Sequence, residues 1–260
     1  MTTQRCSTAP CLISSITLMQ PLLLIDADPI VYRAASAAEE ELEFEPELTV
    51  VIGNFARGRQ IVQQDIHNLC TRFDTDRFIL YFTDELNFRK EVDSTYKGNR
   101  IKRKPAGYKK LKNWAKAKWQ SEQKPKLEAD DAIGIAVTSG QYDNFILCSP
   151  DKDMEQFPCR IWNGKLEFTQ TPEQAAYKRW HQALAGDQTD GYTGVPGIGP
   201  KKADAILSKV KDGKYYEKVR DTYISAGLTE EDALRNIRLA TILTVDHWDE
   251  EKQAVILFSP

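Results

Sequence analysis

The chain has 260 residues, of which 41% are hydrophobic and 28% charged, and its formal net charge is −3. This composition is typical of a folded globular protein with a substantial core, and it excludes an intrinsically disordered chain. No apolar run reaches the roughly 18 residues that span a bilayer, so we expect no membrane segment. The five cysteines form no CxxC pair, which favours a reducing compartment over a disulfide framework or a zinc site.

Residues 1–20 are rich in Ser and Thr and are expected to form a flexible tail. A weak signal peptide is the alternative interpretation, but no small-residue cleavage site precedes the strand-like run Leu22–Ile25. Met19 is an alternative start of the protein, because every informative feature follows it.

Three short apolar runs, Leu22–Ile25, Phe78–Phe82 and Phe145–Cys148, are predicted to be buried parallel strands of an α/β sheet. Each is followed closely by Asp. Because ligand sites in such sheets lie beyond the carboxyl ends of the strands, we expect these acids to meet at one edge. Two further helices are predicted, one over Asn54–Phe73 and one from about Glu128 through Val137. A hairpin is predicted over Cys159–Thr169 with its turn at Asn163 and Gly164, followed by a helix that Thr171 caps and that has Pro172 at its first position. From Gln182 the pattern is mainly helical and ends in a last strand at Ala254–Phe258.

Five groups of acidic residues accompany these elements and predict a metal site. Hydrolysis of a phosphodiester needs an activated water and neutralised phosphoryl oxygens, which two hard cations ~3.5–4 Å apart provide. Mg²⁺ prefers carboxylate oxygens, and Mn²⁺ is the alternative ion. A single Asp at a strand end is most often structural, but so many carboxylates together would repel one another without cations. The groups are Asp26; Asp84; Glu128, Asp130 and Asp131; Asp151 and Asp153; Asp187 and Asp190, whereas Asp28 is interpreted as a turn residue.

The stretch Tyr96–Lys126 carries twelve Lys or Arg against one acid, Glu122, which gives about +11 and leaves the rest of the chain strongly acidic. A basic ridge beside an acidic pocket suits a metal-dependent enzyme that acts on a polyanion. A solvated, lysine-rich helix face is the alternative. One face of this stretch has apolar residues at near-helical spacing, which we expect to pack rather than to stack on single-stranded DNA: Tyr108, Leu111, Ala115 and Trp119.

Residues 194–203, GVPGIGPKKA, are the most specific local signal in the chain. Gly197 and Gly199 can adopt positive φ and leave backbone N–H groups uncovered, and a proline suits the start of the next helix, whose N-terminus would face a phosphate. Lys201 and Lys202 add positive charge there. This pattern predicts a helix–hairpin–helix element that holds duplex DNA without reading its sequence; a plain turn between two helices is the alternative.

With these residues in place, the chain resembles the flap-endonuclease/5′-nuclease family, in particular the 5′-3′ exonucleases of podoviruses, the short-tailed phages. The resemblance spans about Leu22 to Lys209. Its motifs follow the family's order: LLLIDAD at 22–28, FTDELNFRKE at 82–91, YKGNR at 96–100, LEADD at 127–131, SPDKD at 149–153 and GDQTDGYTGVPGIGPKKA at 186–203. Ser149 and Pro150 replace the more flexible residues often found before the DKD pair, which removes no ligand.

The resemblance implies a PIN-like, parallel-sheet 5′-nuclease core, a helical arch over the active site and a C-terminal helix-three-turn-helix element that binds duplex DNA. It also implies two Mg²⁺ sites, and a monovalent cation at the glycine hairpin is a further candidate. Carried onto matching positions, the tighter metal site comprises Glu128, Asp130, Asp131 and Asp151, bordered by Asp26 and Asp84, and the second comprises Asp153, Asp187 and Asp190. Lys97 and Arg100 would contact the scissile phosphate, Tyr96 would stack on the terminal base, and the remaining DNA contacts would come from Lys102, Arg103, Lys104, Gly197, Gly199, Lys201 and Lys202.

We therefore expect a metal-dependent 5′-3′ exonuclease acting on duplex DNA ends, a monomer working in the cytoplasm of a phage-infected cell in DNA breakdown, primer removal or recombination. A structure-specific 5′ flap endonuclease is the nearest alternative. A non-catalytic duplex-binding protein and a toxin-like ribonuclease are alternatives from other classes. The expected organisation is a tail at 1–20, an α/β nuclease core at 21–180 with the basic arch at about 96–126, and a helical duplex-binding region at 181–260.

Overall fold

The computed structural model describes residues 20–45, 48–99, 103–211 and 213–260. The expected N-terminal tail, Arg100 and Lys102 lie outside these ranges. A central sheet runs through the described chain in the order β5–β4–β1–β6–β7–β8, and its neighbours are parallel except for the β7–β8 hairpin. The strands are β1 (Leu22–Asp26), β4 (Phe78–Tyr81), β5 (Ser121–Glu122), β6 (Phe145–Cys148), β7 (Arg160–Trp162) and β8 (Glu167–Thr169).

The three strands predicted from the sequence are confirmed as the centre of this sheet. β1 lies between β4 and β6, pairs with both in parallel, and is buried along its whole length. Successive side chains of a strand point to opposite faces, so Leu23 and Ile25 enter one hydrophobic cluster while Leu22 and Leu24 enter another. Both faces of the sheet are therefore covered, as a continuous apolar run predicts.

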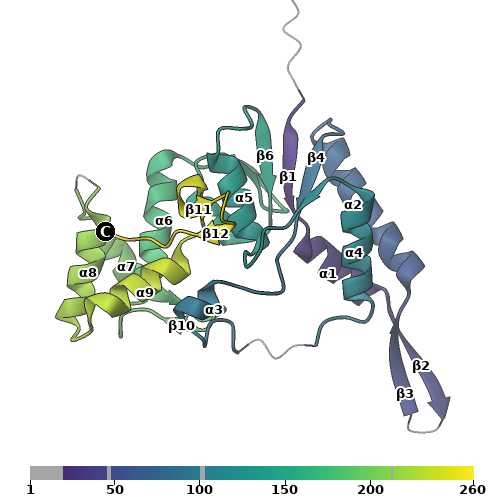
Figure 1. Cartoon of the computed structure of the whole chain (residues 1–260), viewed down its shortest axis with the longest axis horizontal. Coiled ribbons are helices and arrows are strands. Elements are labelled where there is room, and N and C mark those ends of the chain that lie inside the picture. The colour runs from purple at the N-terminus through teal and green to yellow at the C-terminus, as the bar shows by residue number, and fades with distance from the viewer. Residues whose placement is uncertain (1–19, 46–47, 100–102, 212) are drawn as a thin grey trace, which may run out of the picture.

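Helices cover the two faces unequally (Figure 1). α1 (Asp28–Ala37), α2 (Phe55–Arg72) and α4 (Tyr108–Lys118) pack on one face, and α5 (Ala129–Thr138) packs on the other. The predicted helix after Asn54 is confirmed, and the Asn54 side chain caps it by accepting the backbone N–H of Arg57.

The C-terminal part is helical, as expected, with a cluster of its own. α6 (Pro172–Ala185), α7 (Pro200–Leu207), α8 (Tyr215–Ser225) and α9 (Glu230–Ala240) pack around Trp180, Leu184, Val219 and Tyr223. Thr171 and Gln174 form the capping box that starts α6. The expected last strand is reduced to β12 (Ala254–Val255), which pairs with β11 (Trp248–Asp249). None of the helices in the described ranges has the length and apolarity to cross a membrane.

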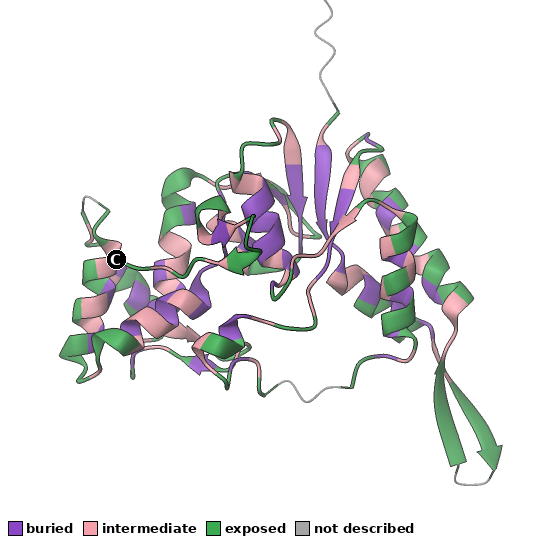
Figure 2. Ribbon diagram, in the orientation of Figure 1, coloured by how far each residue is buried: buried purple, intermediate pink, exposed green. Residues whose placement is uncertain are grey.

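A protruding hairpin, β2 (Glu39–Glu45) and β3 (Leu48–Gly53), was not predicted from the sequence. Figures 1 and 2 show it extending away from the body as an exposed ribbon. Its base is tightly fitted, because a Cβ on Gly53 would stand 2.4 Å from the carbonyl oxygen of Ala106. Acidic residues alternate with the apolar ones in β2, whereas β3 is an apolar run without acids. Both strands are exposed, with large apolar side chains at Leu42, Phe44, Leu48, Val50, Val51 and Ile52.

The expected arch takes a different form in the structure. Tyr108, Leu111 and Ala115 are buried against α1 and α2, so α4 is part of the α/β core rather than a free helix over it. This confirms that its aromatic and apolar residues pack. Before α4, α3 (Arg89–Val92) lies beside α9 of the helical part, so the described residues of this stretch belong to both parts of the molecule.

Candidate active site at the carboxyl edge of the sheet

Acidic groups from four separate stretches of chain line one cavity. Asp26 is the last residue of β1, Asp84 follows β4 and Asp151 follows β6. Glu128 is the N-cap of α5, and Asp130 lies in its first turn, where the helix dipole favours negative charge. The cavity holds about 840 Å³. The folding of parallel strands thus places five acids from distant sequence positions around one space.

Asp28, which the sequence suggested to be a turn residue, also lines this cavity. Its carboxylate accepts the backbone N–H of Thr83 at 2.7 Å and the hydroxyl of Tyr108 at 2.9 Å, and it lies 3.3 Å from the Lys112 amine. Asp28 therefore ties the start of α1 to the end of β4 and to α4.

The carboxylates of the cavity disfavour one another's ionisation. Burial, followed by the charges of Asp28 and Asp151, raises the pKa of Asp26 to about 7. Burial, followed by the charges of Asp26 and Asp151, raises the pKa of Asp130 well above its usual value. Ser149 donates a hydrogen bond of 3.0 Å to Asp26, which offsets part of this effect. An added cation would relieve the remaining repulsion.

Lys97 connects the cavity to a second group of acids. Its amine contacts the carboxylate of Glu128 and lies 3.7 Å from that of Asp190. Although burial alone raises the pKa of Glu128, the charges of Lys97 and Arg89 together hold it below its usual value. The backbone N–H of Lys97 also donates to the carbonyl of Asp190 at 2.7 Å, so this lysine is fixed between the two groups.

Tyr96 does not have the expected position. Its side chain is only 2% exposed, and its hydroxyl donates to Asp190 at 2.7 Å and to Glu128 at 3.1 Å. The ring stacks on that of Tyr192 inside the protein. Tyr96 is therefore a buried support of the site, and the expected stacking on a terminal base is wrong.

The second group of acids is gathered by a residue that the sequence did not indicate. The side-chain amide of Gln182 on α6 donates to Asp153 and to Asp187, at 3.1 Å in each case. Burial, then the charge of Asp151, raises the pKa of Asp153 to about 6, and its other carboxylate oxygen is buried with no hydrogen-bond partner. Asp187 accepts the backbone N–H groups of Thr189 and Asp190, which closes the turn between β9 (Gly186–Asp187) and β10 (Tyr192–Thr193).

The donor set suits a hard divalent cation, because it consists of carboxylate oxygens, among which Asp26, Asp130 and Asp153 have raised pKa values and one buried oxygen of Asp153 has no hydrogen-bond partner. Across the described ranges, no three acidic, His or Cys side chains already converge closely enough to hold an ion. The assignment of individual ligands therefore stays a prediction.

Asp131, expected to be a ligand of the tighter metal site, has another role. It is fully buried and receives two hydrogen bonds from the Arg89 guanidinium, at 2.7 and 2.8 Å. It also accepts the backbone N–H of Leu243 at 3.1 Å. Its neighbour Asp130 lines the cavity. Since successive helix residues point about 100° apart, α5 turns one of these two carboxylates to the cavity and the other to the core.

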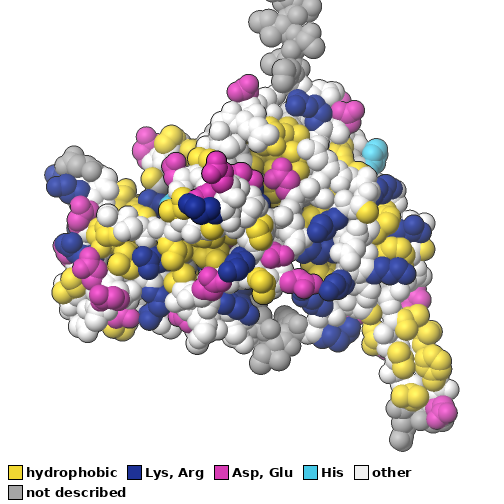
Figure 3. Space-filling view, viewed as in Figure 1, with side chains coloured by type: hydrophobic (Ala, Val, Ile, Leu, Met, Phe, Trp, Pro, Cys, Tyr) yellow, Lys and Arg dark blue, Asp and Glu magenta, His cyan; other side chains and the backbone are white. Residues whose placement is uncertain are grey.

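Basic side chains also line the acidic cavity, and some of them pair with its acids. Lysines of α4 and the segment before it line it, and Figure 3 shows Lys and Arg side chains gathered on that side of the molecule. Arg103 lies apart from them, because its guanidinium bonds to Glu39 at the base of the β2–β3 hairpin at 2.7 Å. The lysines that line the cavity are Lys97, Lys104, Lys109, Lys112 and Lys116.

The glycine hairpin leads from β10 into α7. Gly197 has a φ of +75°, and neither Gly197 nor Gly199 has an atom within 4 Å of an added Cβ, so the backbone there is open to solvent. Lys201 and Lys202 are exposed on the first turn of α7, and the Lys202 amine bonds back to the carbonyl of Gly197 at 2.8 Å. Gly197 thus has the positive φ that the sequence allowed, whereas Gly199 is extended with a φ of −91°, and the helix–hairpin–helix role stays a prediction.

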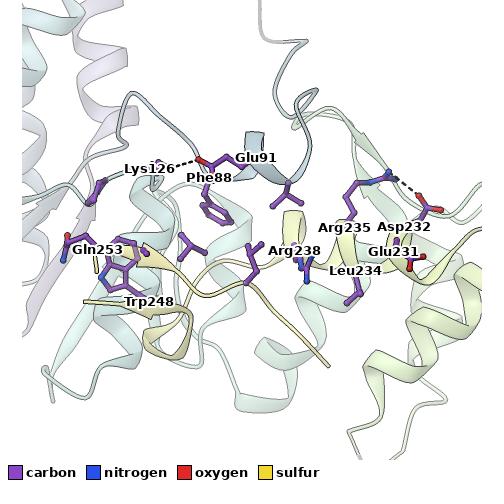
Figure 4. A pocket seen from close by; sticks show the side chains of 15 residues that line it. Phe88, Glu91, Lys126, Glu231, Asp232, Leu234, Arg235, Arg238, Trp248 and Gln253 are labelled. Carbon is purple, nitrogen blue, oxygen red and sulfur yellow. Dashed lines mark hydrogen bonds and ion pairs between the residues drawn. The ribbon is translucent and has the colours of Figure 1, made fainter. Parts of the chain in front are cut away.

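Another cavity, of about 650 Å³, lies between α3, α9 and the β11–β12 hairpin (Figure 4). Phe88 and Trp248 contribute apolar walls. Among its charged residues, Lys126 pairs with Glu91, and Arg235 pairs with Asp232. None of the predicted site residues lines this cavity.

Comparison with known proteins agrees with this fold. Residues 21–180 match the family described as 5′-3′ exonuclease, N-terminal resolvase-like domain. The exodeoxyribonuclease of Enterobacteria phage T3 is 28% identical, with 92% of this chain and 93% of the relative covered. The exonuclease of Escherichia phage T7 is 29% identical, with the same coverage. Among solved structures, the bacteriophage T5 D15 flap endonuclease in a pseudo-enzyme-product complex with DNA and metal ions is 17% identical, with a TM-score of 0.60 over 85% of this chain and 88% of that chain.

A mainly parallel sheet with acids at its carboxyl edge and a basic flank defines the protein as an α/β enzyme of the 5′-nuclease class. The chain belongs to the 5′-3′ exonuclease family and is a 5′-3′ nuclease.

Replacing Asp131 tests the structural role of its ion pair. Asp131→Ala leaves the Arg89 guanidinium buried without its partner, which costs about 3–5 kcal/mol of unfolding free energy. We expect a large fall in the denaturant midpoint, measured by chemical unfolding. Asp130→Ala is the matched control on the same turn, and it is expected to leave stability unchanged or higher. Equal stability of the Asp131 variant and the wild type would contradict the assignment.

The raised pKa of Asp26 predicts a pH-dependent stability. Its ordinary pKa is 3.8 and its folded-state pKa is about 7, so the folded protein holds the proton more tightly and loses stability as pH rises through that interval. Asp26→Asn removes this effect. In chelator, we expect it to raise the melting temperature at pH 8 and to change it much less at pH 5. The exposed loop variant Asp143→Asn is the control, and an identical shift of the Asp26 variant at both pH values would contradict the prediction.

Proposed function

We propose that the protein is a metal-dependent 5′-3′ exonuclease that degrades duplex DNA from its 5′ ends, with 5′ flap cleavage as the nearest alternative. The observation that carries this proposal is the cavity that is lined by seven acidic residues and five lysines. The phage T3 and T7 relatives carry the names exodeoxyribonuclease and exonuclease, which supports action on DNA during phage infection, in the host cytoplasm. We propose a monomer, with a role in DNA breakdown, primer removal or recombination.

The proposed cofactor is a pair of Mg²⁺ ions, with Mn²⁺ as the alternative. When bound, such ions supply an activated water and neutralise charge on the phosphoryl oxygens and the leaving group. The raised pKa values of Asp26 and Asp130 and the orphaned oxygen of Asp153 support a divalent ion at this edge. The proposed holders are Glu128, Asp130 and Asp151 for the tighter site, bordered by Asp26 and Asp84, and Asp153, Asp187 and Asp190 for the second.

The proposed role of Lys97 is to hold a phosphoryl oxygen of the substrate. Its amine lies between Glu128 and Asp190, so it faces the boundary of the two acidic groups. A compact ammonium at this position adds positive charge directly beside two of the proposed metal holders, Glu128 and Asp190. Arg100 is proposed to share this role on the basis of the YKGNR motif.

Duplex DNA is proposed to lie along the glycine hairpin, with its backbone at the open N–H groups of Gly197 and Gly199 and at the exposed Lys201. A helix N-terminus beside uncovered N–H groups attracts a phosphate. The same proposal includes a monovalent cation at this turn. It also divides the chain into a core at 21–180 and a duplex-binding region at 181–260. Lys104 and the α4 lysines are proposed to hold the strand that enters the cavity.

One assay distinguishes the main alternatives. A 5′-labelled blunt duplex, a 5′ flap and a flap with a blocked end are incubated with the protein and Mg²⁺, with and without chelator. An exonuclease releases mononucleotides from the blunt duplex, whereas a flap endonuclease releases the intact flap. Absence of cleavage on all three substrates would favour the non-catalytic duplex-binding alternative, and equal cleavage in chelator would exclude the metal mechanism.

Replacing Asp151 separates cleavage from binding. Asp151→Ala removes a proposed ligand at the end of β6, so we expect cleavage to fall by at least about a thousandfold, because losing a ligand disrupts both ions' effect on the transition state. Duplex binding in chelator, measured by fluorescence anisotropy, is expected to stay within about twofold. Asp143→Ala, at the opposite end of the same strand, is the matched control. Normal turnover of the Asp151 variant would show that the metal centre is assigned wrongly.

Replacing Lys201 tests the hairpin. Lys201→Ala removes one proposed phosphate contact, so it is expected to weaken duplex binding about equally for all sequences and to reduce the salt-dependence slope by about 1. The measurement is anisotropy over a series of salt concentrations. The control is Lys209→Ala, because Lys209 is also an exposed lysine but lies beyond the end of α7. An unchanged slope for the Lys201 variant would place the duplex elsewhere.

A further inference from the structure

A separate cavity of about 530 Å³ adjoins the acidic one on the other side of the start of α1. Asp26 and Pro29 line both cavities, so a molecule in the second would lie next to the carboxylates of the first. Its volume lies within the range of small-molecule sites, roughly 300–1,000 Å³. The quoted motifs contribute Ile25, Asp26, Ser149 and Pro150 to its wall, and the rest of the lining comes from residues outside those motifs.

The walls of this cavity combine apolar surface with positive charge. Ile30, Leu69 and Trp162 provide the apolar part. The guanidinium of Arg72, an exposed residue at the end of α2, lies over the Trp162 ring at 3.7 Å from its centre. Within the described ranges, Arg72 makes no hydrogen bond or ion pair, so its N–H donors are available to a ligand.

Among the described residues that line the cavity, Arg72 is the cation without an ion pair, and Asp26 adds a carboxylate at the side shared with the acidic cavity. Arg33 pairs with Asp65, so these two charges offset each other. The side-chain carbonyl of Asn68 accepts a hydrogen bond from Gln64 at 2.8 Å, which leaves the Asn68 amide N–H groups as additional donors. A guanidinium with free donors binds phosphate, and apolar walls beside it accommodate a sugar and a base.

We propose that this cavity is a nucleotide-binding subsite, with the phosphate on Arg72 and the nucleoside against Ile30, Leu69 and Trp162. The proposal deepens the proposed nuclease function and rests on it for its biological meaning. The nucleotide has two possible sources with the same chemistry: the mononucleotide released by cleavage, or a nucleotide within the bound DNA.

The test uses the full chain in chelator, so that no cleavage occurs. Binding of dTMP and of thymidine is measured by isothermal titration calorimetry on the wild type, Arg72→Gln and Arg59→Gln. Arg59 is the matched control, because it lies on the same helix and also stacks on an aromatic ring, that of Phe55 at 5.0 Å, but does not line the cavity. Thermal unfolding of each variant verifies that it is folded.

We expect dTMP to bind the wild type and the Arg59 variant with equal affinity and the Arg72 variant about tenfold or more weakly, in line with the loss of a charged hydrogen bond. Thymidine, which lacks the phosphate, is expected to bind more weakly than dTMP to the wild type and equally to the wild type and the Arg72 variant. Equal dTMP affinity of the Arg72 variant and the wild type, or no dTMP binding at all, would overturn the subsite.

Cleavage assays with Mg²⁺ then identify the source. If the released mononucleotide occupies the subsite, dTMP inhibits the wild type and the inhibition is lost in Arg72→Gln with KM for duplex unchanged. If a nucleotide within the DNA occupies the subsite, the KM of the Arg72→Gln variant for duplex DNA rises instead. A protein that cleaves DNA but binds no dTMP refutes the subsite alone, whereas one that binds dTMP but does not cleave refutes the nuclease proposal alone.

Discussion

The buried ion pair between Arg89 and Asp131 joins three parts of the molecule that are far apart in sequence. Arg89 comes from α3, Asp131 from the first turn of α5, and the guanidinium also donates to the carbonyls of Leu239 and Thr241 at the end of α9. Because a buried charge is costly unless it is paired and hydrogen-bonded, separating any of these segments would leave groups of this network without partners. The pair thereby fixes the start of α5 at the edge of the sheet and attaches the helical part to the core.

With α5 held in this way, the remaining acids are forced close to one another. Burial and like charges raise the pKa of Asp26 and Asp130, and the only lysine amine in contact with both acidic groups in the described chain belongs to Lys97. The site therefore combines acids whose ionisation is disfavoured with one cation fixed at their boundary. This group of carboxylates does not itself stabilise the fold, and it favours the binding of a positively charged ligand.

The second acidic group and the glycine hairpin belong to one tightly packed stretch of chain. Asp187 and Asp190 lie in the turn between β9 and β10, and the glycine hairpin starts directly after it. The base of this unit is tightly packed: a Cβ on Gly194 would stand 2.0 Å from the carbonyl oxygen of Leu184, and one on Gly186 would stand 2.3 Å from the backbone nitrogen of Gly194. A duplex held on the hairpin would thus have a fixed position relative to the second acidic group.

The sequence by itself determined the central strands, most helices and the gathering of acids at one edge. These features follow from local periodicity and from the rule that parallel strands share a carboxyl edge. Only the tertiary structure decided which of the adjacent Asp130 and Asp131 faces the cavity, that Tyr96 is buried, and that α4 packs on the core. Periodicity defines a face of an element but not its partner. The partner of Asp131 lies 42 residues earlier in the chain, a distance over which no local pattern carries information.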